Sequence, residues 1–417
     1  MTLNAKRRRA HSKLAALPGV RSVRRPVTPG AEQRFDLHYI RTGPASVRPL
    51  VVIPGGPGVA SIAQYRTLRK HLAADGVDVL MVEHRGIGMS RHDDAGRDLP
   101  PDALTVEQVV DDIGAVLDAE NVAQADVYGT SYGTYIASGV GVRHPGRVHA
   151  MVLDSPVLSA GDIQASRDAI RSLMLYGTSP ETRRLAPKAR RLLDAGLLTS
   201  ADVEVLSTVY GYGGADLLER QFDLLLGGHE LLWHGMARIT ALMLRKFPYR
   251  NEIDLVGRIA FRELDYAGKP DGLPLDPSAA MLLMRDQLNG AAPDFEAEPF
   301  DLAAEMPRFA WPTVVLSGGR DLTTPFALAQ RAAELIPEAV LVRLPTAPHG
   351  LLDFRDRAAR DVISTVRTGD YRELDSRAAE LDAMPSRLPL RLLAPALTAA
   401  AIVERALPAH SPKPATS

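Results

Sequence analysis

Residues 126–142 read DVYGTSYGTYIASGVGV, and this stretch decides the fold. Its first residues have the apolar character of a short buried strand, and the small residues after Gly133 predict a closely packed helix. Between them, residues 129–133 match the pattern G-x-S-x-G around Ser131. A turn that leads directly from strand to helix strains the central residue, and a glycine on each side avoids side-chain clashes. The pattern therefore predicts an exposed serine hydroxyl at the sheet edge, above a helix N-terminus that favours developing negative charge.

Strand and helix patterns alternate along the chain on both sides of this turn. Helical periodicity is present at 62–74 and at 106–117, where Thr105 and Gln108 fit a capping box. Short apolar or alternating stretches predict strands at 34–41, 50–53, 77–82, 126–128, 150–153, 313–316 and 340–344. Strands and helices at this spacing predict right-handed crossovers and an α/β fold, with a mostly parallel sheet covered by helices on both faces.

The pattern changes after residue 157. The following stretch is dominated by helical periodicity without a convincing strand, which predicts a helical insertion into one α/β core. The N-terminal residues contain eight basic residues and no acid, which is typical of a solvated, partly disordered leader. In the proline-rich tail, the longest uncharged apolar run, 392–403, falls short of the ~20 residues that span a bilayer, and a docked or frayed tail is expected. The predicted units are a leader at 1–30, a core at 31–157 and 310–370, an insertion at 158–309 and a tail at 371–417.

The composition excludes several classes of protein. Of 417 residues, 46% are hydrophobic and 24% are charged, a balance that excludes disordered, collagen-like and membrane-embedded chains. The net charge of −1 gives no global attraction to nucleic acid or acidic lipid, and the absence of cysteine excludes a thiol nucleophile. His229 and His234 are about 140° apart on a helix, too far to form the H-E-x-x-H zinc site. We expect a cytoplasmic protein with no cofactor, no metal, no nucleic-acid partner and no integral membrane segment.

A serine hydroxyl needs a base to accept its proton and an acid to orient that base. Two late strands end in residues of these types: 313–316 leads to Asp321, and 340–344 leads to His349. We therefore predict the triad Ser131, Asp321 and His349. Three other acids could orient the histidine, and Asp321 is preferred because it directly follows a strand and a turn signal; the rivals are Asp154, Asp301 and Asp353.

The glycine-rich segment 54–58, PGGPG, follows the first strongly apolar strand. Glycines allow the backbone to come close to a substrate, and backbone N–H groups stabilise the oxyanion of a tetrahedral intermediate. The N–H groups of Gly56 and Tyr132 are the best pair for this task.

Several segments resemble one branch of the α/β-hydrolases, the proline iminopeptidases and tripeptidyl aminopeptidases. They are PGGPG at 54–58, EHRGIGMS at 83–90, GTSYGT at 129–134, GRD at 319–321 and PHG at 348–350. The order serine, aspartate, histidine is also that of α/β-hydrolases. The chain departs from the family at two positions. Where the family has HGGPG, this chain has Pro54 in place of the histidine, and where the family has DQRG, this chain has Glu83-His84 in place of Asp-Gln.

The resemblance implies that the helical insertion is a cap over the active site and that acidic cap residues bind the free α-amine of a peptide. Asp286 is the first candidate for this role and Glu263 the second. The predicted function is therefore an aminopeptidase that acts through an acyl-enzyme on short peptides. Two alternatives stay open: a carboxylesterase acting on small acyl esters, and a non-catalytic ligand-binding protein with the same fold.

Overall fold

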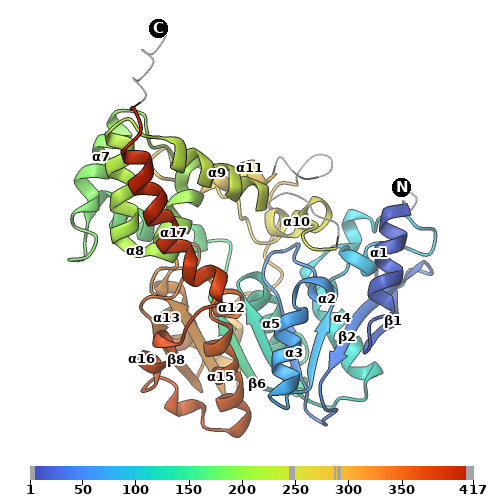
Figure 1. Cartoon of the computed structure of the whole chain (residues 1–417). Helices are drawn as coiled ribbons and strands as arrows, with labels where there is room; N and C mark the ends of the chain where they lie inside the picture. The colour runs from blue at the N-terminus through green and yellow to red at the C-terminus, as the bar shows by residue number, and fades with distance from the viewer. Residues whose placement is uncertain (1–4, 244–248, 286–287, 289–292, 410–417) are drawn as a thin grey trace.

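The computed structural model describes residues 5–243, 249–285, 288 and 293–409 (Figure 1). At its centre lies an eight-stranded sheet with the order β1-β2-β4-β3-β5-β6-β7-β8. β2 pairs antiparallel with β1 and β4, and the pairs from β4 to β8 are parallel. The strands are β1 (Val20–Pro26), β2 (Arg34–Thr42), β3 (Leu50–Ile53), β4 (Val79–Val82), β5 (Ala125–Thr130), β6 (Val148–Asp154), β7 (Thr313–Gly318) and β8 (Ala339–Leu344). The predicted α/β fold with a mostly parallel sheet is confirmed.

Helices cover both faces of this sheet because the side chains of each strand alternate between two apolar layers. In β5, Val127 belongs to the layer under α4 and α5, and Tyr128 to the layer under α3 and α15. The helices of the core are α2 (Ser61–Gln64), α3 (Arg66–Ala74), α4 (Val106–Ala119), α5 (Tyr132–Arg143), α13 (Phe326–Leu335), α14 (Leu351–Phe354), α15 (Asp356–Thr368) and α16 (Ala378–Ala383). Thr105 caps α4, with its Oγ1 accepting the N–H of Gln108 at 3.2 Å.

Between β6 and β7 the described residues form helices and no strand. Most of these helices lie above the sheet and form a cap with an apolar cluster of its own (Figure 1), while the helices at 253–262 and 302–305 contribute to an apolar cluster of the core. The helices of this segment are α6 (Asp162–Arg171), α7 (Leu185–Asp194), α8 (Val203–Leu226), α9 (Leu231–Met243), α10 (Ile253–Arg262), α11 (Ser278–Arg285) and α12 (Leu302–Glu305). Within α8, Gly214 has φ 65°, and this residue marks a kink that lets the helix bend over the core.

The N-terminal segment differs from the predicted solvated leader. It forms a helix, α1 (Ala5–Ala15), and the edge strand β1, whose sequence VRSVRRP contains two valines and three arginines. Its arginines pair with acids of the core: Arg21 with Glu120 at 2.6 Å, and Arg25 with Asp112 at 2.8 Å. The correction has a physical reason, because a basic run becomes an ordered edge strand when the neighbouring surface supplies carboxylates.

The C-terminal segment also belongs to the folded body. After α16 the chain leaves the core, and α17 (Leu388–Arg405) runs across the cap against α8 and α9 (Figure 1). Among the residues described, no helix is both long and apolar enough to span a membrane.

Candidate active site

Ser131 occupies the strained turn between β5 and α5. Its φ of 52° is a left-handed value that a serine rarely adopts. The turn is held from both sides, because the Ser131 N–H donates to the Asp154 carbonyl at 2.9 Å and the Ser131 carbonyl accepts the Thr134 N–H at 2.8 Å. A Cβ on Gly133 would lie 2.2 Å from the Ile53 carbonyl oxygen, so the second glycine of the motif is sterically required.

His349 and Asp321 come from the loops after β8 and β7, and they are hydrogen-bonded. The distance from His349 Nδ1 to Asp321 Oδ2 is 2.8 Å. Asp321 Oδ1 accepts the N–H groups of Thr323 and Thr324, each at 2.9 Å, so the carboxylate is fixed in place. Nδ1 is therefore the protonated nitrogen of a neutral His349 ring, which leaves the Nε2 lone pair available as a base.

The electrostatics of the pair support this arrangement. Burial alone would lower the pKa of His349, but the charge and hydrogen bond of Asp321 outweigh it and raise the pKa above 6.5. Burial alone would raise the pKa of Asp321, but His349 and the bonds from Thr324 outweigh it and lower the pKa. The pair therefore stabilises an imidazolium, the species a general base becomes after it accepts a proton.

Asp154 links the serine turn to the histidine loop. Its backbone carbonyl binds Ser131, and its carboxylate accepts the N–H groups of Leu351 and Leu352, each at 3.0 Å. Tyr128 donates its hydroxyl to the same carboxylate at 3.0 Å. Asp154 thus holds the two loops together from behind, without a hydrogen bond to the imidazole.

The two remaining rival acids are also engaged elsewhere. Asp301 caps α12, accepting the N–H of Ala304 at 3.1 Å. Asp353 accepts the hydroxyl of Tyr65 at 2.8 Å. Of the four acids weighed from the sequence, the structure brings Asp321 into hydrogen-bonding contact with His349.

The two predicted oxyanion donors lie on either side of the serine. Gly56 has φ 127° and lines the same cavity as Ser131, and a Cβ on its neighbour Gly55 would lie 3.2 Å from Ser131 Cβ. Tyr132 is the first residue of α5, so its N–H has no partner within the helix. Gly56 and Tyr132 therefore remain the candidate oxyanion donors at Ser131.

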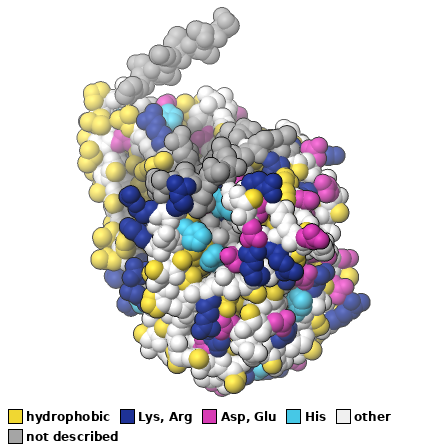
Figure 2. Space-filling model, turned by 90° about the vertical axis from the view of Figure 1, so that its right-hand side faces the viewer, with side chains coloured by type: hydrophobic (Ala, Val, Ile, Leu, Met, Phe, Trp, Pro, Cys, Tyr) yellow, Lys and Arg dark blue, Asp and Glu magenta, His cyan; other side chains and the backbone are white. Residues whose placement is uncertain are grey.

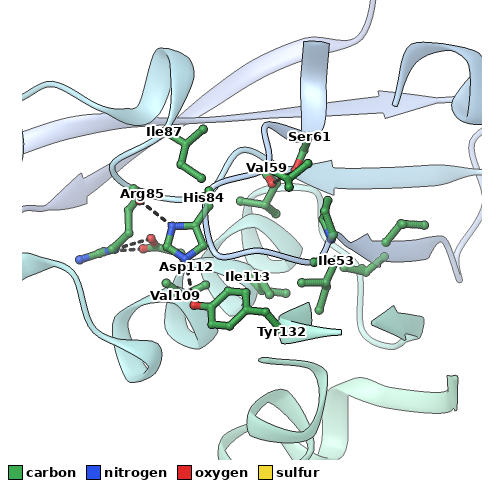
Figure 3. Close-up of a pocket in the computed structure, with 16 residues that line it drawn as sticks. Ile53, Val59, Ser61, His84, Arg85, Ile87, Val109, Asp112, Ile113 and Tyr132 are labelled. Atoms are coloured by element: carbon green, nitrogen blue, oxygen red, sulfur yellow. Dashed lines mark hydrogen bonds and ion pairs between the residues drawn. The ribbon is translucent and has the colours of Figure 1, made fainter. Parts of the chain in front are cut away.

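The side chain of Tyr132 is anchored behind the site by His84 (Figure 3). Burial lowers the pKa of His84 to about 4, so the ring is neutral. His84 Nδ1–H donates to the Arg85 carbonyl at 2.6 Å. His84 Nε2 accepts the hydroxyl of Tyr132 at 3.1 Å. In the sequence, His84 is only a departure from a family pattern. The contact that gives it a role joins residues 48 positions apart.

A cavity of about 220 Å³ opens beside Ser131 beneath the cap. Apolar side chains form much of its wall, and three carboxylates face it, while no lysine or arginine is among its described lining residues; the carboxylates are Asp162, Glu204 and Asp265. Asp162 is half-buried, desolvation raises its pKa to about 6, and it accepts the N–H of Leu158 at 2.6 Å. The cavity is thus lined by acids, hydroxyl groups and apolar side chains.

Glu204, near the start of α8, is the acid that stands out. It is half-buried and has no hydrogen bond or ion pair with another described residue. Burial raises its pKa, and the charge of His349 partly offsets this, which places the carboxylate within electrostatic range of the candidate base. No feature of its local sequence, DVEVLS, distinguishes it from a surface glutamate.

Neither of the two acids predicted to bind an amine, Asp286 and Glu263, is among the described residues that line this cavity. Glu263 does not line this cavity; its Oε2 accepts the N–H of Val106 at the start of α4 at 2.8 Å, and its other oxygen pairs with Arg262. The expectation for Glu263 is therefore wrong, because its charge is used to cap a helix of the core. Asp286 lies outside the described residues.

Comparison with known proteins agrees with this architecture. A family model described as alpha/beta hydrolase fold matches residues 48–194, which include β3 to β6 and the turn at Ser131. Together with the strand order and the elbow geometry, this match shows that the chain has the α/β-hydrolase fold. The 2-hydroxymuconate semialdehyde hydrolase of Pseudomonas sp. (strain CF600) is 34% identical over 148 residues, which cover 35% of this chain and 46% of that protein. The chain thus spans about half the length of this relative.

Solved structures are similar at a lower level. The proline iminopeptidase of Mycobacterium smegmatis has 17% identity and a TM-score of 0.49, over 84% of this chain and 99% of that chain. A thermophilic esterase from Thermogutta terrifontis has 15% identity and a TM-score of 0.45, over 84% and 99% of the two chains. Likenesses this distant have no bearing on the reaction.

Proposed function

We propose that this α/β-hydrolase-fold protein is a serine hydrolase. Ser131 Oγ attacks the substrate carbonyl carbon, and its proton passes to Nε2 of His349, which Asp321 orients. The N–H groups of Gly56 and Tyr132 hold the oxyanion of the tetrahedral intermediate. Collapse of that intermediate breaks the bond to the leaving group, which takes the proton from His349, and water then releases the acyl group from Ser131.

We further propose that the preferred substrate is a short peptide with a free N-terminal amine, which makes the enzyme an aminopeptidase. The observation that carries this proposal is the wall of the cavity beside Ser131, which has three carboxylates and no cation among its described residues. Such a wall attracts an ammonium group and repels an anionic substrate such as a muconate. The apolar remainder of the cavity suits an uncharged side chain next to the scissile bond.

Within this wall, Glu204 takes the role that the sequence analysis gave to Asp286 and Glu263. Two lining acids, Glu204 and Asp265, have no side-chain hydrogen bond or ion pair with a described residue, and Glu204 is preferred because its carboxylate is within electrostatic range of His349. An incoming ammonium would provide the first ion pair of Glu204. Pairing with an ammonium also favours the ionised carboxylate, which reverses the effect of burial on the Glu204 pKa. The same contact would set a fixed distance between the peptide N-terminus and Ser131, which is what an exopeptidase needs.

The first experiment tests the hydrolase. A fluorophosphonate should label one serine per chain, and Ser131→Ala should abolish the labelling. Labelling that persists in Ser131→Ala would exclude this nucleophile. A parent chain that is not labelled and turns over no ester or amide would favour the non-catalytic binding protein.

The second experiment tests the substrate class. Each aminoacyl substrate is compared with its N-acetylated form in the parent and in Glu204→Gln. Charge-assisted hydrogen bonds contribute about 1.5–3 kcal/mol, so Glu204→Gln should lower kcat/KM for the free-amine form about 10- to 100-fold. The acetylated form should be nearly unaffected, and Glu181→Gln, at an exposed position, is the matched control. Equal hydrolysis of both forms by the parent would favour the carboxylesterase.

A further inference from the structure

The outward face of α17 is apolar along its whole length. Leu388 is 63% exposed, Leu392 57%, Ile402 64% and Val403 63%. Apart from Arg391 and Arg405, the exposed residues between and beyond them are also small or apolar, among them Pro395, Ala396, Ala399, Ala406 and Leu407. Five of the twelve large hydrophobic side chains exposed in the described part of the chain belong to this face, and three more belong to the neighbouring α9. Figure 2 shows hydrophobic side chains gathered along its left edge. That edge is the side of the molecule that faces the viewer in Figure 1, where α17 is drawn.

The opposite face of α17 fixes the helix on the cap. Ala394 and Leu397 pack against the apolar cluster of the cap, and Ala401 is 5% exposed. The Glu404 carboxylate accepts the N–H groups of Leu231 and Leu232 at 2.6 and 2.9 Å, which caps the start of α9. The apolar face is therefore presented in a defined orientation on a docked helix.

The unpaired charges of α17 itself are of one sign, and the acid beside Ile402 and Arg405, Asp223, is paired with Lys188 at 2.6 Å. Arg391 and Arg405 lie near the two ends of the apolar face, and neither makes a hydrogen bond or ion pair with another described residue. The single acid within α17, Glu404, is 5% exposed and bonded to α9, so it does not neutralise them. Glu230, at the edge of the surface, lies 3.8 Å from His234. An exposed apolar stripe with unpaired arginines at its ends is suited to an anionic partner.

A second copy of the chain is a poor fit to this surface. Arg391 and Arg405 lie seven residues before and after residue 398, so an antiparallel pair of α17 helices centred there would bring Arg391 of each copy against Arg405 of the other. A parallel pair would bring each arginine against itself. Both arrangements place like charges together in an apolar interface, which opposes association.

We propose that α17 docks on the surface of an anionic lipid bilayer. The helix would lie in the plane of the interface, with its leucine, isoleucine and valine side chains at the boundary of headgroups and acyl chains and its arginines at lipid phosphates. The face is aliphatic and has no aromatic residue, whereas interfaces between proteins are enriched in tyrosine, tryptophan and phenylalanine. This docking does not depend on the proposed catalytic function.

The test is co-sedimentation of the full chain with vesicles of phosphatidylcholine alone or of phosphatidylcholine mixed with phosphatidylglycerol. We expect binding to the mixed vesicles that weakens with added salt, and little binding to phosphatidylcholine alone. Replacing Arg391 and Arg405 together by glutamine should weaken binding about tenfold and reduce its salt dependence. Leu392→Gln combined with Ile402→Gln should weaken binding at least as much.

The matched controls are Val47→Gln and Leu273→Gln, which change side chains that are 92% and 58% exposed elsewhere on the molecule. They should bind as the parent does, and circular dichroism with thermal unfolding checks that every variant is folded. Absence of binding to mixed vesicles, or equal binding to both vesicle types, overturns the proposal. A dimer in light scattering that Ile402→Gln dissociates would assign the face to a second copy instead.

Discussion

The imidazole of His349 has one hydrogen-bonded carboxylate, and the choice of that carboxylate decides the chemistry. Asp321 contacts the ring, whereas Asp154 contacts the backbone of the loop that follows the ring. Substituting Asp321 therefore tests the tautomer of His349, and substituting Asp154 tests the position of the loop. Both carboxylates are buried, so amide substitutions preserve their volume.

Asp321→Asn should leave the chain folded and lower kcat about 10⁴-fold, because the imidazole would be held in the wrong tautomer. Asp154→Asn should retain the tautomer and instead lower thermal stability, because it weakens the contacts to Leu351 and Leu352. Steady-state kinetics and thermal unfolding of both variants distinguish the effects. A severe kinetic loss in Asp154→Asn with a mild one in Asp321→Asn would assign the triad to Asp154.

The pH profile gives a second measure of the same pair. The neutral form of His349 is the base, so the rate falls as the pH drops through the His349 pKa. Asp321 raises that pKa above 6.5, so the acid limb of the parent should lie above the value of a free histidine. In Asp321→Asn the raising effect is lost, and the acid limb should move to lower pH although the plateau is reduced. An unmoved acid limb would contradict the assigned pair.

His84 offers a prediction about the oxyanion donor. His84→Leu removes the acceptor of the buried Tyr132 hydroxyl, which should cost about 1–3 kcal/mol of unfolding free energy and lower kcat more than it changes KM. Tyr132→Phe is the matched change, because it removes the other partner of the same bond. In the double variant the two losses should be less than additive. Additive losses would show that the contact does not position the Tyr132 N–H.

At the scale of elements, the N-terminal helix reaches the glycine-rich loop through the cap. Arg7 of α1 forms an ion pair with Glu252, which is fully buried just before α10. The backbone N–H of Glu252 donates to the Gly58 carbonyl at 2.9 Å, and its carboxylate accepts the Gly88 N–H at 2.5 Å. One residue thus joins α1, α10 and the loop that contains Gly56.

Arg7→Met should lower the unfolding free energy by about 3 kcal/mol, because it leaves the buried Glu252 carboxylate without its closest cation. The second cation, Arg91, is 3.7 Å from Glu252, so the remaining pairing is weaker. Adding Glu252→Gln to Arg7→Met should restore part of the stability by removing the unpaired charge. Arg9→Met, at an exposed position of α1, is the control. An equal loss of unfolding free energy in Arg9→Met would refute a specific role for the Arg7–Glu252 ion pair.

On the scale of the whole molecule, most of the cap has an apolar cluster distinct from those of the core, although Leu255, Val256 and Ile259 of α10 belong to a core cluster. Leu206 is fully buried in the cap cluster, and Leu153 is fully buried in the cluster under the sheet. Leu206→Ala should cost about 2–5 kcal/mol but leave the triad assembled, so it should impair turnover of free-amine substrates more than phosphonate labelling. Leu153→Ala should impair both activities together. Labelling and turnover lost in parallel in Leu206→Ala would mean that the cap and the core unfold as one unit.

Features that depend on neighbours along the chain can be predicted from the amino-acid sequence. The seven predicted strands, the turn at Ser131 and the helix cap at Thr105 follow from local patterns, and the structure contains them. The pairing of Asp321 with His349 was predictable because the carboxyl ends of parallel strands meet at one edge of the sheet. These features need only a few consecutive residues and the rules of sheet topology.

Only the tertiary structure decided where the remaining charges act. Glu263 caps a helix 157 positions away, Arg25 pairs with an acid 87 positions away, and Glu204 faces the cavity without a partner. Each of them sits in sequence surroundings that look like those of a surface residue. A carboxylate becomes a helix cap, an ion-pair partner or a candidate substrate contact according to the groups that folding brings within a few ångströms, because both the cost of burying a charge and the gain from pairing it are set by that environment.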